Sequence, residues 1–304
     1  HILHAITGKL ALTLIPVYVD HGLRPGEVEQ EKALFAKVSN TLGLLCEIVE
    51  IDVRGSARER KISIEHAARD LRYQALRAVK QQYKAHYIAV GHHADDQAEE
   101  VLIRLLRGSS RKAIAGMQRV SNDLVRPLLQ LSKQQIYSYL REKSIAFCQD
   151  SSNQDTTYLR NRIRGELLPY LEQEYDPGIR KALLKTASNL QQDEALLSQL
   201  VEEVEENVVL KTEKTTATQH DQCIVDRQSL KSYHPALQRR FLEKLLWKIG
   251  APSRYEHIIA LLNAVHAKKS GHELHLPRGL RVIFSREKVA FSYPRGRGPW
   301  RGTL

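Results

Sequence analysis

The first half of the chain alternates between short apolar runs and longer stretches with helical periodicity. Leu12–Val19 is a nearly continuous apolar run with β-branched residues, which predicts a strand buried on both faces. Pro16 cannot donate a ladder hydrogen bond, which favours a paired strand that begins there. The following elements alternate in this order: helix Val28–Leu42, strand Leu45–Val53, helix Ser63–Tyr83, strand Tyr87–Val90 and helix Asp95–Arg107. This pattern predicts an α/β fold with a doubly wound parallel sheet, whose ligands lie beyond the carboxyl ends of the strands.

The second half of the chain is mainly helical in pattern. Gly178–Asn207 has the periodicity of one long helix, and the polar segment Lys211–His220 predicts a loop or linker. A small α+β unit follows, with helices Pro235–Ile249 and Tyr255–Ala267 and a β-hairpin within Glu273–Tyr293 that turns at Pro277–Gly279 or Ser285–Lys288. We therefore expect an α/β domain at 1–173, a helical linker at 174–220 and a small domain with a basic tail at 221–304.

Composition limits the kind of protein that this can be. The 304 residues suffice for two domains, and no apolar run reaches the roughly 18 residues of a membrane span. Cys46, Cys148 and Cys223 lie far apart, which argues against a disulfide framework or structural zinc and favours a reduced, cytoplasmic setting. The net charge of +11 attracts polyanions, with nucleic acid as the first candidate, although a merely basic protein explains the charge equally well.

The densest group of ionisable residues is His92-His93-Ala94-Asp95-Asp96-Gln97-Ala98-Glu99-Glu100, which directly follows a predicted strand. At roughly 100° per residue, His92, Asp96, Glu99 and Glu100 share one stripe of the helix. The neighbouring apolar face contains Ala98, Val101, Leu102 and Leu105. Asp95 and Asp96 could serve only as helix caps, but capping does not explain the other acids and histidines. Two functional interpretations fit: carboxylate ligands for Mg²⁺, or acid–base chemistry.

Two further groups lie near strand or helix ends. In Val19–Arg24, Gly22 permits a tight turn, and Asp20, His21 and Arg24 supply polar groups, although an ordinary strand exit also uses Asp and Gly. Arg160 and Arg164 lie one helical turn apart beside an apolar stripe. Paired guanidiniums suit phosphates, and a solvated basic face is an equally good interpretation.

Several segments occur together in a recognisable order: VDHGLRP, IEHAARDLRYQAL, GHHADDQAEEVLIRLLRGS, VRPLL and DSSNQDTTYLRNRIRGELLP. Together they resemble the tRNA(Ile)-lysidine synthetase family of the N-type ATP pyrophosphatase, or PP-loop, superfamily. The resemblance covers residues 12–170 strongly. Residues 225–293 are more weakly similar to the small tRNA-binding domain of that family.

The resemblance implies a two-step ligase reaction. ATP adenylates the C2 carbonyl oxygen of the wobble cytidine in the CAU anticodon of tRNA(Ile). The ε-amine of free lysine then displaces AMP to give lysidine, which changes codon reading from AUG to AUA. ATP and Mg²⁺ are the implied cofactors, tRNA(Ile) and lysine are the implied partners, and a homodimer is left open.

The resemblance and the residue patterns together assign the candidate site. The catalytic candidates are His92, Asp96 and Glu99, and Asp95 and Asp96 are candidate Mg²⁺ ligands. The ATP-binding candidates are Asp20, His21, Arg24, Arg160 and Asn161. The tRNA-binding candidates are Arg126, Arg164, Arg239, Arg240, Lys244 and Arg281. Our hypothesis gives Glu99 or Asp96 the role of a base that accepts the proton of the attacking amine, while the other binds the metal.

The sequence also departs from the family pattern. The family carries an SGGxDS loop that cradles pyrophosphate, and nothing in residues 1–30 matches it. We expect the segment with that loop to supply a central strand, whose absence leaves an apolar sheet edge exposed, and we expect this chain alone to be inactive. Glu100 stands where the family usually has Thr. The alternatives are a non-catalytic tRNA-binding fragment, or another PP-loop tRNA modifier such as a thiolase, which the dispersed cysteines disfavour.

Overall fold

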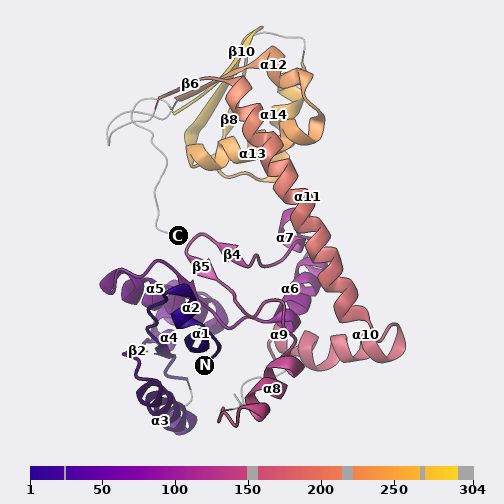
Figure 1. The fold of residues 1–304 in the computed structure, drawn as a ribbon. Helices are drawn as coiled ribbons and strands as arrows, with labels where there is room; N and C mark the ends of the chain where they lie inside the picture. The colour runs from indigo at the N-terminus through magenta and orange to yellow at the C-terminus, as the bar shows by residue number, and fades with distance from the viewer. Residues whose placement is uncertain (24, 149–156, 214–221, 268–270, 294–304) are drawn as a thin grey trace. The chain divides into compact units, whose positions relative to one another are not determined.

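The computed structural model describes residues 1–23, 25–148, 157–213, 222–267 and 271–293. The chain forms two compact units, His1–Gln191 and Gln192–Leu304, which divide within the long helix α11 (Ile179–Val208) (Figure 1). That helix was predicted at Gly178–Asn207, so its position is confirmed within one residue at each end. None of the described helices combines the length and the apolar character that a membrane crossing needs.

Unit 1, His1–Gln191, contains the predicted parallel strands. β1 (Val17–Asp20) pairs in parallel with β2 (Glu47–Glu50), and the helix α3 (Pro25–Thr41) connects the two strands in sequence. β1 begins directly after Pro16, as the missing amide hydrogen predicts. β3 (Ile88–Ala89) pairs in parallel with β5 (Leu124–Val125), and β4 (Val120–Ser121) adds an antiparallel edge. The α/β class is therefore confirmed, with very short strands.

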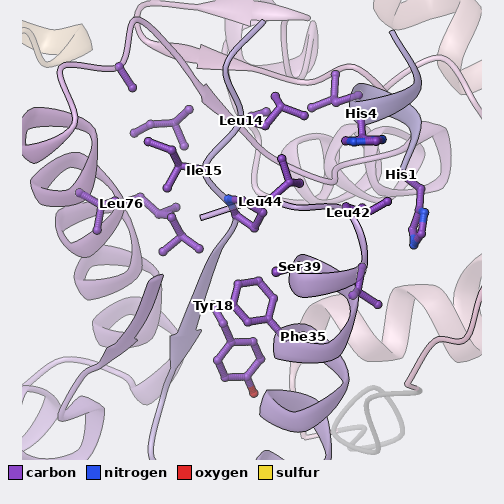
Figure 2. Close-up of a pocket in the computed structure, with 18 of the residues that line it drawn as sticks. His1, His4, Leu14, Ile15, Tyr18, Phe35, Ser39, Leu42, Leu44 and Leu76 are labelled. Atoms are coloured by element: carbon purple, nitrogen blue, oxygen red, sulfur yellow. The ribbon is translucent and has the colours of Figure 1, made fainter. Parts of the chain in front are cut away.

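Within the described residues, the strands β1–β2 and β3–β5–β4 form separate hydrogen-bonded sheets. A pocket of about 790 Å³ borders both β1 and β3. Figure 2 shows that its walls are mainly apolar side chains, among them Leu14, Ile15, Leu44 and Leu76. An additional central strand would fill such a hollow, and that strand stays a prediction.

The helices of unit 1 cover these strands and carry the site. In chain order, besides α3 and the beginning of α11, they are α1 (Ile2–Ala5), α2 (Thr7–Leu10), α4 (Val53–Arg60), α5 (Ile64–Gln82), α6 (Ala94–Leu106), α7 (Arg111–Ile114), α8 (Lys133–Glu142), α9 (Leu159–Arg162), the π-helical turn η2 (Ile163–Leu167) and α10 (Leu168–Glu174). On α6, Ala98, Val101 and Ile103 pack against η2, α10 and α11. Leu105, which was predicted to lie on that face, is instead 47% exposed, because the contact lies on the side of Ile103.

Unit 2, Gln192–Leu304, has one contiguous apolar core. Its described strands form an antiparallel sheet in the order β6 (Val209–Glu213), β7 (Gln222–Asp226), β10 (Lys288–Ser292), β9 (Leu280–Phe284) and β8 (His272–Leu276). The described helices after α11 are α12 (Arg227–Ser232), α13 (Pro235–Ile249) and α14 (Tyr255–His266). Side chains of the sheet and of α11, α13 and α14 share the core.

Two details of unit 2 differ from the sequence interpretation. Both suggested turns occur, since η3 (Pro277–Gly279) joins β8 to β9 and Ser285–Lys288 joins β9 to β10. The loop predicted at Lys211–His220 is wrong for its first three residues, which belong to β6 because β7 supplies hydrogen bonds that a local pattern does not reveal. The rest of that segment and the tail 294–304 lie outside the described residues.

Candidate active site

We call the edge at the carboxyl ends of the parallel strands of unit 1 the ligand edge. The strand register shows which residues lie there. Ala89 pairs with Val125, and the amide of Val90 donates to the carbonyl of Val125 at 3.0 Å. His92 and Arg126 therefore both follow the carboxyl ends of adjacent parallel strands. His93 caps α6: its Nδ1 accepts from the amide of Asp96, and the Asp96 carboxylate accepts from the amide of His93. The capping role predicted for Asp96 is thus present. The start of α6 lies just beyond the end of β3, which is where α/β proteins bind ligands.

An ion-pair network joins α6 to α9 and η2. Glu99 is fully buried, and its carboxylate accepts from Nε of Arg160 at 2.9 Å and from Nε of Arg164 at 2.6 Å. Arg164 also donates to Oδ1 of Asp96 at 3.0 Å, and Arg160 donates to the Asp96 carbonyl at 3.3 Å. Asn161 lies on α9 between the two arginines. The structure thus brings together two of the predicted motifs that are about 60 residues apart.

This network changes what the acids can do as they stand. Both oxygens of Glu99 and one oxygen of Asp96 are already bound by guanidinium groups. Burial acts to lower the pKa of Arg164, but the hydrogen bond and charge of Glu99 and the charge of Asp96 outweigh it, so that this pKa is raised. In this arrangement the acids hold Arg160 and Arg164 in place.

Asp95 has a structural role as well. Its Oδ1 accepts from Nη1 of Arg180 at 3.0 Å, and its Oδ2 accepts from the amide of Lys133 at 2.8 Å. Among the described residues, no three His, Cys, Asp or Glu side chains are placed to hold a metal ion. Asp95 and Asp96 are engaged by protein donors in this arrangement, and their assignment as Mg²⁺ ligands stays a prediction.

The same edge carries positive charge that lacks acidic partners. Arg126 is 7% exposed, donates from Nη1 to the carbonyl of Gln118 at 2.7 Å, and has no described partner for its buried Nε. The buried Nδ1 of His92 also has no described partner. Burial lowers the pKa of His92 to about 4, and the charges of Arg126 and Arg160 act in the same direction, against Asp96. His92 is therefore neutral at pH 7.

A second, smaller pocket lies at the ends of β1 and β2. It has a volume of about 390 Å³ and includes Asp20, His21 and Gly22 in its lining. Asp20 accepts from the amide of Gly22 at 2.8 Å and pairs with Lys32 at 2.7 Å. Burial acts to raise the pKa of Asp20, but the interactions with Lys32 and Gly22 together outweigh burial. The pKa of Asp20 therefore lies below its usual value. Gly22 has a φ of 63°, as the predicted turn requires.

The described hydrogen bond and ion pair of Asp20 stay within this pocket and α3. The predicted convergence of Asp20 and His21 with His92 stays a prediction. Arg24 lies outside the described residues. Asp20 is engaged in a turn and an ion pair, and its role toward ATP stays a prediction.

The tRNA contacts predicted in unit 2 are mostly occupied by acids. Arg240 pairs with Glu194 at 2.7 Å, Lys244 pairs with Glu205 at 2.9 Å, and Arg281 pairs with Glu273 at 2.8 Å. Arg239 is exposed and has no ion pair within the described part of the chain. RNA phosphates would have to compete with an acid at three of these four cations, so Arg239 is the most available cation of the predicted set in unit 2.

The sequence interpretation overlooked Arg69 and Arg72 on α5. Both flank the ring of Tyr73, with guanidinium carbons 5.2 and 5.8 Å from its centroid. Neither has an ion pair with any described residue. The segment IEHAARDLRYQAL contained the signal, two arginines three positions apart in a helix, but only its apolar positions were used.

These features define a class of protein: an α/β unit with a polar ligand edge followed by a small antiparallel unit. The family model of the PP-loop domain matches residues 1–171, and the chain belongs to that family. The chain is 36% identical over 289 residues to the tRNA(Ile)-lysidine synthase of Geobacter sulfurreducens, covering 93% of this chain and 60% of that protein. It is 31% identical over 301 residues to the tRNA(Ile)-lysidine synthase of Bacillus subtilis, covering 96% and 62%. The chain thus spans about three fifths of the length of these curated relatives.

The fold is also similar to that of solved structures, of which a tRNA thiolase is an example. The U34-tRNA thiolase NcsA of Methanococcus maripaludis, with its [4Fe-4S] cluster, superposes with a TM-score of 0.50 at 16% identity. The match covers 63% of this chain and 68% of that one. At this identity the likeness concerns the fold alone.

Proposed function

We propose that this chain acts as a tRNA(Ile)-lysidine synthase, the activity named for its curated relatives. In this proposal ATP activates C2 of the wobble cytidine in the CAU anticodon, and the lysine ε-amine then displaces AMP. The observation that supports it most is the network of Asp96, Glu99, Arg160 and Arg164 at the ligand edge of a PP-loop domain. Guanidinium forks suit phosphate oxygens, so Arg160 and Arg164 are our candidates for binding nucleotide or RNA.

The acids have a defined difficulty to overcome. A free lysine amine has a pKa near 10.4, so its deprotonation at pH 7 costs roughly 4.6 kcal/mol. We retain Glu99 or Asp96 as the proton acceptor, on the condition that Arg160 and Arg164 turn toward substrate phosphates. That movement would release a buried carboxylate next to the attacking amine. His92 is neutral, and its Nδ1, which has no described partner, is available to the base or the nucleotide.

The proposal is tested by incubating the protein from its complete reading frame with ATP, labelled lysine and CAU tRNA(Ile). We expect ATP-dependent transfer of label to the tRNA. In single-turnover assays Glu99→Gln and Asp96→Asn should slow transfer strongly. Glu100→Gln is the matched control, because among the described residues the ion pair of Glu100 is with its neighbour Arg104 at 2.7 Å. No ATP-dependent transfer by the wild type would refute the activity, and normal rates in both variants would refute the roles of the acids.

The remaining assignments belong to the same proposal. We place Mg²⁺ with the ATP, because this ion is usually held by substrate phosphates and water in addition to one or two carboxylates. We place the protein in the cytoplasm, in keeping with its free cysteines Cys46, Cys148 and Cys223. Chelation by EDTA should stop transfer, and light scattering of the purified protein tests the homodimer.

The expected inactivity of residues 1–304 alone is tested separately. In this prediction residues 1–304 alone bind tRNA but form no adenylate, since no segment of residues 1–30 matches SGGxDS. The measurement is release of labelled pyrophosphate from ATP, with tRNA binding as the control for folding. Pyrophosphate release at the rate of the complete protein would contradict the prediction.

A further inference from the structure

The ligand edge of unit 1 has more positive charge than its acids neutralise. Arg160, Arg164 and Arg180 are paired with Asp95, Asp96 and Glu99. Arg69, Arg72 and Arg126 have no ion pair within the described part of the chain. Of these three, Arg126 is buried, Arg72 is half-buried and Arg69 is exposed. A buried cation without a counter-charge destabilises a protein, so the persistence of Arg126 at the ligand edge points to an anion that is supplied from outside.

Position links these cations. α5 packs against both β1 and β3, and Arg126 and His92 follow the ends of the paired strands β5 and β3. Arg160 reaches the first turn of α6 through the carbonyl of Asp96. Burial, followed by the charges of Arg69 and Arg160, lowers the pKa of Arg72, and Arg69, Arg126 and Arg160 all act on His92. Arg126 and Arg160 thus lie at the ligand edge, and Arg69 and Arg72 lie on the helix that packs against its strands.

Arg126 provides the second, independent sign of a ligand. It is more than nine-tenths buried, yet only Nη1 has a described partner and its Nε has none. A purely structural buried arginine normally has its donors satisfied, because each unpaired donor loses its hydration without compensation. The nearby Nδ1 of His92 is buried and also has no partner among the described residues.

We propose that Arg72 of α5, with Arg69 one turn before it, binds a phosphate group together with Arg126 and Arg160. We call these four residues the arginine site. Phosphate is the ligand that fits best, because planar guanidinium forks bind its oxygens two at a time. The inference rests on the proposed function for the source of the phosphate, which is either the nucleotide or the backbone of the tRNA.

The test compares Arg72→Ala and Arg72→Lys with the matched control Arg77→Ala. Arg77 lies on the same helix, is exposed, and only approaches Asp123 at 3.7 Å. Affinities for ATP and for CAU tRNA are measured on the protein from its complete reading frame. We expect Arg72→Ala to weaken one of the two roughly tenfold or more, which is the usual effect of losing a charged hydrogen bond. Arg72→Lys should lose less, and Arg77→Ala should stay within about twofold.

The two sources of phosphate give different results. If the nucleotide supplies it, Arg72→Ala weakens ATP and leaves tRNA unchanged. If RNA supplies it, tRNA binding weakens and the log–log salt slope decreases by about 0.7 to 0.9. Either result supports the arginine site. Unchanged affinity for both ligands, in a variant that unfolds cooperatively, overturns it.

Two controls keep the interpretation clear. If Arg72→Ala does not fold, Arg72→Lys decides, and wild-type affinity for both ligands in that variant overturns the inference. Thermal unfolding with and without inorganic pyrophosphate gives a readout independent of activity, since a ligand bound by the native state raises Tm. If the wild type binds both ligands but transfers no lysine, the proposed function fails while the arginine site stands.

Discussion

Each unit of this protein buries an arginine, and the two residues are satisfied to very different degrees. Arg227 in unit 2 is 2% exposed and donates to the carbonyls of Ala264, Val265, Ala267 and Ser285. Arg126 in unit 1 is 7% exposed and has one described acceptor. The first joins the end of α14 to the β9–β10 turn. The second lies at the ligand edge and has donors without described acceptors. The number of satisfied donors therefore distinguishes a structural arginine from one that is available to bind a ligand.

The apolar cores around these two arginines also differ. Unit 2 has a contiguous apolar cluster built from its sheet and helices, whereas unit 1 has small separate clusters around α6 and around α4–α5. The buried polar residues of unit 1 include Asp96, Gln97, Glu99 and Arg126. A buried polar network stabilises the fold when all its groups are paired, and a group left unpaired in the low dielectric is costly. The following substitutions test this contrast.

The largest effect on stability is expected for Arg227→Met. The substitution leaves the carbonyls at the end of α14 without donors, and each unpaired buried acceptor costs about 1–3 kcal/mol. We expect a loss of about 3–5 kcal/mol in the free energy of unfolding of unit 2. Urea unfolding followed through Trp247 on α13 measures it, with exposed Arg239→Met as the control. A loss below about 1 kcal/mol would show that water replaces the guanidinium without difficulty.

Glu99→Gln should rank second. It removes the negative charge between Arg160 and Arg164, whose side chains are about one quarter exposed, so solvent screens part of the effect. We expect a loss of about 2–3 kcal/mol, below the 3–5 kcal/mol of a fully buried broken pair. Hydrogen exchange of α6 amides would report it locally. Glu100→Gln, which breaks only an i,i+4 pair, should lose about 0.3–0.5 kcal/mol.

Much of the architecture could be read from local pattern. α13 was predicted at Pro235–Ile249 and has those bounds, because an apolar stripe, an N-terminal proline and a terminal glycine all agree. β6 was missed because its pairing partner β7 lies beyond the polar segment. Local patterns cannot contain hydrogen bonds that a distant strand supplies.

The site was only partly predictable for the same reason. Asp96 and Glu99 lie on α6 as predicted, whereas His92 precedes that helix, which begins at Ala94 after its cap His93. The three candidates are close in sequence and were therefore visible in it. The sequestration of Glu99 by Arg160 and Arg164 depends on contacts across more than 60 residues. Arg72 was missed because an arginine on an amphipathic helix resembles a solvated basic face until its neighbours are known.

A pH dependence is expected from His92. Its pKa is lowered from 6.5 to about 4 in the folded state, chiefly by burial, so below pH 6.5 the unfolded state binds more protons. Stability should therefore be lost as the pH falls from about 6.5 towards 4, by at most about 3 kcal/mol and by less with solvent screening. The measurement is the difference in unfolding free energy between wild type and His92→Gln across this range. Equal pH profiles would show that His92 titrates normally.

The smallest effect on stability, and the sharpest test of the contrast, is expected for Arg126→Leu. A buried cation without a counter-charge loses hydration that one carbonyl cannot replace, so an apolar side chain should leave the unfolding free energy unchanged or raise it by about 1 kcal/mol. The same change should weaken binding of the phosphate-bearing ligand roughly tenfold. Urea unfolding and ATP and tRNA titrations of the same preparation give both numbers. Opposite signs for stability and affinity identify a charge kept for a ligand, whereas a loss of several kcal/mol would place Arg126 beside Arg227 as a structural arginine.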